Sequence, residues 1–90
     1  MKNFIIEIRR ECLQPATFWA QPKGVEVQEV LRRTGMTPQS ASEYLGISVN
    51  SNGRTVRKWM SEEAPIPYSA WALLCDAAGF EPFWRIDRDE

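Results

Sequence analysis

The sequence contains no histidine and only two cysteines, Cys12 and Cys75, which stand far apart in the chain. It therefore has no Cys-x-x-Cys pair and no thiol with an imidazole, so composition excludes a zinc site or a cysteine–histidine catalytic pair. A glycine-rich phosphate loop and acid pairs of recognisable spacing are also missing. We expect no metal, no cofactor, no small-molecule substrate and no enzymatic activity.

Long apolar runs are missing as well. No segment approaches the roughly 18 to 20 apolar residues that a membrane span requires. Near the N-terminus, Ile5 and Ile6 are followed closely by Glu7, Arg9 and Arg10, which is not the pattern of a secretory signal. We therefore expect a cytoplasmic protein, without membrane contact, in which both thiols are reduced and buried.

Charge is small in total but unevenly distributed. Ninety residues with 43% hydrophobic side chains predict one domain, 1–90, that folds without metals or disulfides. The formal net charge of −1 is weakly unfavourable for a nucleic-acid partner. However, residues 23–59 hold six basic and three acidic side chains, a local charge of +3, whereas the rest of the chain carries −4. This segregation is typical of a local DNA-facing patch.

The spacing of apolar residues predicts a mainly α-helical domain. We expect four helices, at about 25–34, 38–45, 52–60 and 67–78, and short terminal strands at 4–9 and 83–88. Thr37 and Pro38 are suited to the start of the second helix, and Gly46 to its end. Ser51 or Asn52 is the expected N-cap of the third helix.

Several aromatic residues are expected to lie in the core. Phe18 and Trp19 follow Pro15 in a loop and should fold back onto it. Tyr44 belongs to the predicted buried face of the second helix, and Trp59 and Trp71 fall on apolar stripes of the third and fourth helices. Core packing is favoured over base stacking for both of these tryptophans.

The region from Thr37 to Pro67 resembles the helix-turn-helix of lambda-repressor-like (Cro and phage-repressor) regulators, including small regulators of phages and mobile elements. The matching segments, after Thr37 itself, are Leu-Gly-Ile-Ser at 45–48, Arg-Thr-Val-Arg-Lys-Trp at 54–59, Ser61 and Pro-Ile-Pro at 65–67. The resemblance implies a four-to-five-helix domain of this family, covering about a third of the chain directly and two-thirds with the flanking helices.

The chain departs from the family pattern in three places. The turn at 49–53, Val-Asn-Ser-Asn-Gly, is several residues longer than the tight family turn. Pro38 replaces a polar residue that commonly contacts phosphate, and Ser42 replaces a small alanine. The longer turn either tilts the third helix or adds a loop that contacts DNA, and the sequence leaves both alternatives open.

The resemblance also implies which residues contact DNA, because the third helix would lie in the major groove. Arg54, Thr55 and Lys58 are expected at base edges or the groove wall, and Arg57 at a base or a phosphate. The remaining candidates contact phosphates or adenine edges from the second helix and the long turn: Gln39, Ser40, Asn50, Ser51 and Asn52. The opposing interpretation is that the cations form only a solvated helix face. Arg32 and Arg33 either contact phosphate or complement a helix dipole.

The leading hypothesis is a sequence-specific regulator of double-stranded DNA, a repressor that binds a palindromic operator as a homodimer. One helix reads only a few base pairs, so two half-sites about 34 Å apart are needed. Either terminal strand could pair across the two-fold axis. The alternative is a small protein-interaction module, such as an antitoxin-like partner or a phage-encoded inhibitor of host machinery. The operator sequence, the sign of regulation and any effector are left open.

Overall fold

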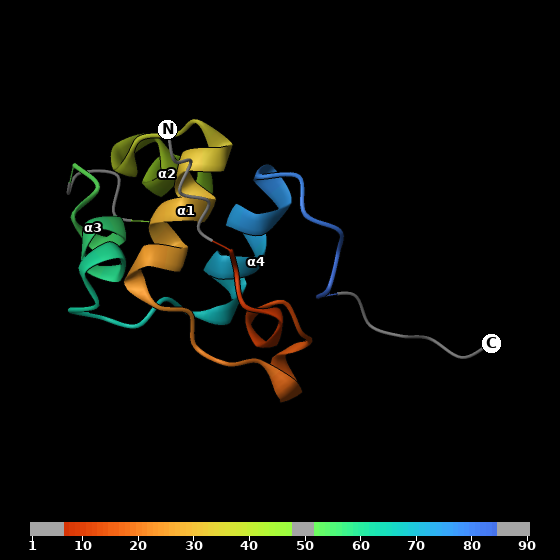
Figure 1. The fold of residues 1–90 in the computed structure, drawn as a ribbon. Helices are drawn as coiled ribbons and strands as arrows, with labels where there is room; N and C mark the ends of the chain where they lie inside the picture. Colours follow the sequence, from red (N-terminus) through yellow and green to blue (C-terminus); the bar gives the residue numbers. More distant parts are fainter. Residues whose placement is uncertain (1–6, 48–51, 85–90) are drawn as a thin grey trace, which may run out of the picture.

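Four α-helices and two short 3-10 turns make up the computed structural model, which describes residues 7–47 and 52–84 (Figure 1). The turns are η1 (Arg10–Cys12) and η2 (Ala16–Phe18). The helices are α1 (Gly24–Thr34), α2 (Pro38–Leu45), α3 (Arg54–Ser61) and α4 (Tyr68–Ala77). The prediction of a mainly helical chain with four helices is confirmed.

Helix α1 lies at the centre of the arrangement and packs against both α3 and α4, which flank it on opposite sides (Figure 1). Helix α2 packs against α3 and, less extensively, against α4. The side chains between the helices are apolar and almost fully buried: Cys12, Val27, Val30, Leu31, Ala41, Val56, Trp59, Ile66, Ala70, Trp71, Leu74 and Cys75. Burial of this set holds the four helices in one arrangement.

Local capping signals place the ends of α1 and α2 where the sequence predicts them. The Thr37 hydroxyl accepts a hydrogen bond from the Ser40 backbone N–H at 3.1 Å, and Pro38 occupies the first position of α2. Gly35 and Gly46 end α1 and α2 with φ of 77° and 74°. Such left-handed angles are inexpensive only for glycine, so these two helix ends are fixed by sequence alone.

The start of α3 differs from the prediction. The N-cap is Gly53, with φ 80°, rather than Ser51, which lies outside the described residues, or Asn52. A Cβ at Gly53 would lie 2.6 Å from the Pro38 carbonyl carbon. The close approach of α3 to the first turn of α2 therefore requires glycine here, and α3 begins at Arg54.

At its other end, α3 is joined to α1. The Gly24 N–H donates to Glu62 Oε2 at 2.8 Å, and Gln28 Nε2 donates to the Met60 carbonyl at 3.0 Å. A Cβ at Gly24 would lie 2.3 Å from that same carbonyl oxygen. The first turn of α1 can therefore approach the last turn of α3 only because residue 24 has no side chain.

The predicted terminal strands are not shown. In the described parts of these segments, 7–9 and 83–84, no residue is in a strand, and 4–6 and 85–88 lie outside the described residues. The Arg9 N–H donates to Glu26 Oε2 at 2.9 Å instead of to a strand partner, and the chain then turns into η1. Phe83 packs its ring edge-to-face on Tyr68 and Trp84.

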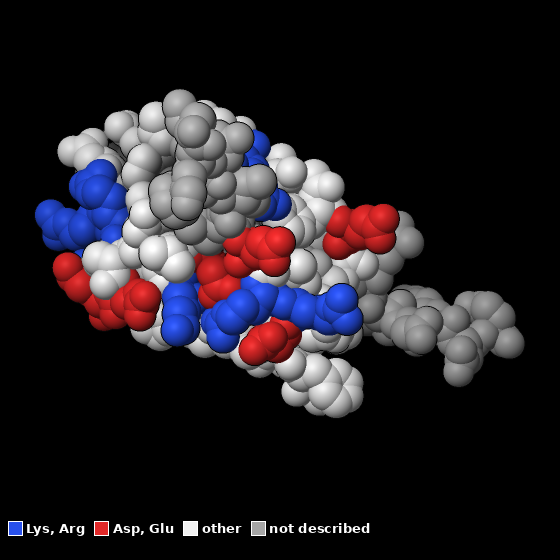
Figure 2. All heavy atoms as spheres, in the orientation of Figure 1, with Lys and Arg blue, Asp and Glu red and all other residues white. Residues whose placement is uncertain are grey.

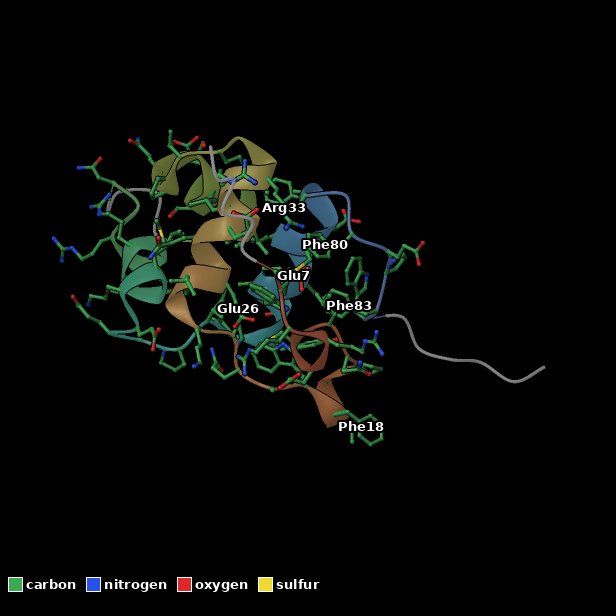
Figure 3. The ribbon with its side chains drawn as sticks, in the orientation of Figure 1. Glu7, Phe18, Glu26, Arg33, Phe80 and Phe83 are labelled. Atoms are coloured by element: carbon green, nitrogen blue, oxygen red, sulfur yellow. The ribbon has the colours of Figure 1, made fainter. Side chains whose placement is uncertain are left out.

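Two of the five expected core aromatics are exposed. The predicted burial of Phe18 and Tyr44 is wrong, since they are 73% and 47% exposed, and Phe18 points away from the helices in Figure 3. The short turn η2 carries Phe18 outward, while Trp19 packs its ring on Tyr68. Trp59 and Trp71 lie in the core as predicted.

Both cysteines are buried free thiols, as expected. Burial, then the nearby Glu26 carboxylate, raises the pKa of Cys12 to about 11, and burial raises that of Cys75 to about 12. The two thiols therefore stay protonated at neutral pH and are poor nucleophiles. No helix within the described ranges is both long and apolar enough to span a membrane.

Candidate nucleic-acid interface

The cations of α3 form an exposed stripe along the helix. Arg54, Arg57 and Lys58 are at positions i, i+3 and i+4, which share one helix face. The opposite face is buried, with Val56 fully inaccessible and Trp59 only 5% exposed. Figure 2 shows basic side chains gathered at the edge of the molecule where Figure 1 places α3. Burial of Val56 and Trp59 thus fixes the direction in which the cationic stripe points.

None of these three cations forms an ion pair with another described residue, although Glu63 lines an open hollow together with them. Across residues 7–47 and 52–84, every ion pair involves Arg9, Arg32 or Arg33, and none involves a cation of α3. Glu62, which follows α3, instead accepts the hydrogen bond from Gly24. The charged groups of the stripe are therefore exposed and held in no ion pair with a described residue.

Arg57 has a second, structural contact. Its Nη1 donates to the Asn52 carbonyl at 2.5 Å, which joins α3 to the end of the lengthened turn. Asn52 is exposed and has φ 56°, an uncommon angle for a residue other than glycine. One guanidinium N–H is used in this bond, so the remaining donors of Arg57 are available for another acceptor.

The N-terminal ends of α2 and α3 meet at Gly53. A Cβ there would lie 2.7 Å from the Gln39 backbone nitrogen, so the Gln39 residue lies next to the start of α3. Gln39 is exposed, whereas the half-buried Ser40 uses its hydroxyl to accept the Thr37 N–H at 2.9 Å. Unpaired backbone N–H groups at a helix N-terminus attract anions. Helix α3 has no side-chain cap at this end, whereas in α2 Pro38 has no N–H and the Ser40 N–H is bonded to Thr37.

The structure thus brings together some of the predicted site residues. The start of α2 and the outer side of α3 carry five exposed residues, Gln39, Asn52, Arg54, Arg57 and Lys58, and Thr55 is half-buried beside them. Asn50 and Ser51 lie outside the described residues. The Ser40 hydroxyl is engaged in the cap of α2.

Sequence reasoning missed Gln28 of α1. It borders an open hollow together with Arg54, Arg57 and Lys58, and its amide bonds the last turn of α3. Gln28 is an ordinary exposed residue in the helical pattern of 25–34. Only the packing of α1 beside α3 reveals that it borders the cationic stripe.

Arg32 and Arg33 have acidic partners within their own helix. Arg32 Nη2 and Arg33 Nε lie 2.6 and 2.7 Å from Glu29 Oε2. Hydrogen bonds from Arg32 and then Arg33 lower the pKa of Glu29 to about 2. Arg33 also lies 5.4 Å over the Phe80 ring, a cation–π contact between two residues labelled in Figure 3. These contacts favour the structural interpretation of the two arginines over phosphate binding.

No protein-family model and no solved structure matches the chain. Two proteins of Escherichia coli, both named transcriptional repressor protein KorC, are similar to it. One is 54% identical over 78 residues, covering 87% of this chain and 91% of the relative. The chain belongs to the KorC family. The second KorC relative is 49% identical over 80 residues, covering 89% of this chain and 93% of its own.

The KorC match extends well beyond the two helices on which the expectation of a regulator rested. Almost the whole length of both KorC proteins is aligned, so the similarity includes segments outside α2 and α3. The names of these relatives agree with the regulator expected from the sequence. Membership of the lambda-repressor-like family in particular stays a prediction.

Proposed function

We propose that this protein is a transcriptional repressor that binds double-stranded DNA in a sequence-specific manner, with α3 in the major groove. The observation that supports this most directly is the exposed cationic stripe of α3, which has no acidic partner among the described residues. The KorC relatives, which are named as transcriptional repressors, support the same function.

We assign base reading to the exposed side of α3. Arg54 and Thr55 in the first turn would contact base edges or the groove wall, because the N-terminal residues of a recognition helix enter the groove most deeply, and Lys58 would do so from the following turn. An arginine fork bound to guanine discriminates against a wrong base by about 1–3 kcal/mol. We therefore assign most of the sequence preference to Arg54.

We assign phosphate binding to the residues around the start of α3. Gln39 lies beside the start of α3 and, together with the uncapped N-terminal N–H groups of α3, would hold one DNA strand. Arg57, fixed to Asn52, would contact a phosphate at the groove wall. We retain Ser40, Asn50 and Ser51 as further candidates for backbone contacts from α2 and from the long turn.

The repressor would bind a palindromic operator as a homodimer. Helix α3 has only eight residues and reads a few base pairs, too few to define a site in a genome. Two copies related by a two-fold axis would read two half-sites about 34 Å apart.

A matched pair of arginine substitutions tests this proposal. The target is first selected from a random pool of double-stranded DNA, and affinities are then measured by fluorescence anisotropy with competitor DNA. Arg54→Ala should weaken binding of the dimer by about 30-fold or more, because each of its two subunits loses a contact worth about 1–3 kcal/mol, and it should relax the preference at one position of each half-site. Its melting temperature should stay near that of the original protein, because Arg54 is exposed.

Arg32→Ala is the control, since it removes the same charge from an exposed side chain on a helix other than α3. Its affinity should change by less than about threefold, as expected for charges away from the interface. Equal effects of the two substitutions would show that only overall charge matters. A protein that selects no DNA sequence would contradict the proposed function itself.

A further inference from the structure

The outer face of α4 carries exposed apolar side chains away from the DNA-binding region. Trp71, Leu74 and Cys75 of α4 are fully buried, but Leu73 on the other side is 45% exposed. An open hollow runs along this outer face. Its lining comes from α4 and from the chain that follows it: Tyr68, Ser69, Ala72, Leu73, Asp76 and Trp84.

We infer that this face of α4 is the surface through which a second copy of the chain binds, with the two α4 helices crossing in antiparallel directions. The inference names the interface of the dimer in the proposed function and rests on that function for its role at the operator. It replaces the terminal strands, which were the expected interface and are not shown in the described residues.

The sequence of the face is complementary to itself. In an antiparallel crossing centred between residues 72 and 73, Ala72 faces the partner's Leu73, so a small side chain accommodates a large one. In the same register, Ser69 faces the partner's Asp76, so a hydroxyl donor meets a carboxylate acceptor. A two-fold axis repeats each contact, and the arrangement closes as a dimer.

Asp76 is suited to such a contact. Its side chain is exposed, and within the described ranges it takes part in no ion pair. Trp84 and Tyr68 border the hollow and would cover the crossing from its edge. The face therefore combines an apolar centre with a polar edge, as protein interfaces usually do.

The position of α4 also fits the spacing of two half-sites. Helices α3 and α4 pack on opposite sides of α1 (Figure 1). With about 9 Å between packed helix axes, α3 lies up to about 18 Å from α4, and two α3 helices up to about 45 Å apart across an α4 pair. The required distance of about 34 Å falls within this reach.

The interface would be small. We expect two ten-residue helices and their flanking rings to bury less than the roughly 1,200 Å² that is the lower limit of specific, stable interfaces. A dimer that dissociates at micromolar concentration is therefore expected, with the operator favouring the paired form by mass action.

Exchanging Ser69 and Asp76 tests the inference without DNA. Sedimentation equilibrium is used to measure the dissociation constant of the dimer for the original protein, Ser69→Asp, and Ser69→Asp combined with Asp76→Ser. Ser69→Asp places two carboxylates opposite each other and should weaken the dimer by at least about tenfold. The double variant restores a hydroxyl opposite each carboxylate and should recover the original constant within about threefold.

Misfolding would not produce a loss of the dimer in Ser69→Asp and its recovery in the double variant. An aspartate in the first turn of α4 and the loss of one from its last turn both favour the helix dipole, so neither change weakens the helix. As a second test, Leu73→Asp should give a monomer. Val25→Asp, the control at a 51% exposed apolar residue of α1, should remain a dimer.

The outcomes separate this inference from the proposed function. Failure of the double variant to recover the dimer, or an original protein that is monomeric at high concentration, would overturn the α4 interface. DNA selection and the Arg54→Ala measurement would still test the proposed function independently of this result. Loss of DNA preference with an intact dimer would instead overturn the proposed function.

Discussion

Glu26 shows how one side chain can organise a chain of this size. Its carboxylate is 3% exposed and accepts hydrogen bonds from Arg9 Nε and Nη2, both at 2.9 Å, and from the Lys23 N–H at 2.7 Å. The bond from Lys23 caps α1, and those from Arg9 fix the segment before η1. Burial raises the pKa of Glu26, but these hydrogen bonds outweigh it and lower the pKa to about 2.

Acid should therefore destabilise the protein through Glu26. Its folded pKa lies below the value of about 4.3 for an unfolded chain, so its stabilisation is complete above that value. It is lost progressively as the pH falls from about 4.5 to 2. Urea unfolding at pH 7 and pH 3 should show a clear decrease in the free energy of unfolding.

Glu26→Gln provides the comparison. The variant should be less stable at pH 7, because a neutral amide cannot pair with Arg9, and its loss of stability on acidification should be smaller. Part of the pH dependence should persist, since Glu29 also has a lowered pKa. A variant that loses as much stability as the original protein between the two pH values would exclude this role for Glu26.

At the scale of elements, the relation between α2 and α3 depends on their contact at Gly53. The residue has a left-handed φ, and the α2 backbone occupies the space where a Cβ would lie. Gly46 also has a left-handed φ, but nothing lies within 4 Å of its Cβ position. An alanine at Gly46 would therefore cause backbone strain alone, whereas an alanine at Gly53 would cause the same strain and a steric clash with α2.

Gly53→Ala should lower the free energy of unfolding by about 2–4 kcal/mol, from backbone strain together with overpacking. Gly46→Ala should cost about 1–2 kcal/mol, from strain alone. Chemical denaturation measures both. We also expect Gly53→Ala to weaken DNA binding under conditions in which it is folded, because α3 must move away from α2. Equal losses of stability in the two variants would show that the clash is relieved without cost.

The elements that the sequence predicted well carry their signals locally. The Thr37 cap, Pro38 and the glycines at 35 and 46 act within one turn of their own helix, so spacing and residue type were sufficient. Gly53 could not be recognised as the start of α3, because its role depends on a contact with Pro38. The exposure of Tyr44, like the extended segment at Arg9, depends on tertiary neighbours.

The candidate site was predictable to the same degree. Burial of Val56 and Trp59 follows from helical spacing, so the outward direction of Arg54 and Lys58 could be expected. The position of Gln28 beside them depends on how α1 packs against α3. The pairing of Arg32 also has a local signal, because Glu29 stands three residues earlier in the same helix, whereas Arg54 has no acidic residue at that spacing.

On the scale of the whole molecule, charge distribution decides how DNA binding depends on salt. A net charge of −1 gives no general attraction to DNA, so affinity must come from the patch around α3. With the three cations of the stripe neutralising about one phosphate each in both subunits of a dimer, the logarithm of affinity should fall against the logarithm of salt concentration with a slope near −5.

Titrations of the selected operator over about 50–300 mM salt would measure this slope. Lys58→Ala should make it less steep by about two, one for each subunit. An affinity that does not depend on salt would be incompatible with binding through the cationic stripe.

The attachment of α3 at both of its ends has a further consequence. The start of α3 contacts α2 at Gly53, and its end contacts α1 at Gly24. The outward-pointing positions of α3 take no part in these two contacts. Arg54, Thr55 and Lys58 can then be exchanged without disturbing the scaffold. Related chains could acquire new target sequences through a few surface replacements, each recognising a different promoter with the same architecture.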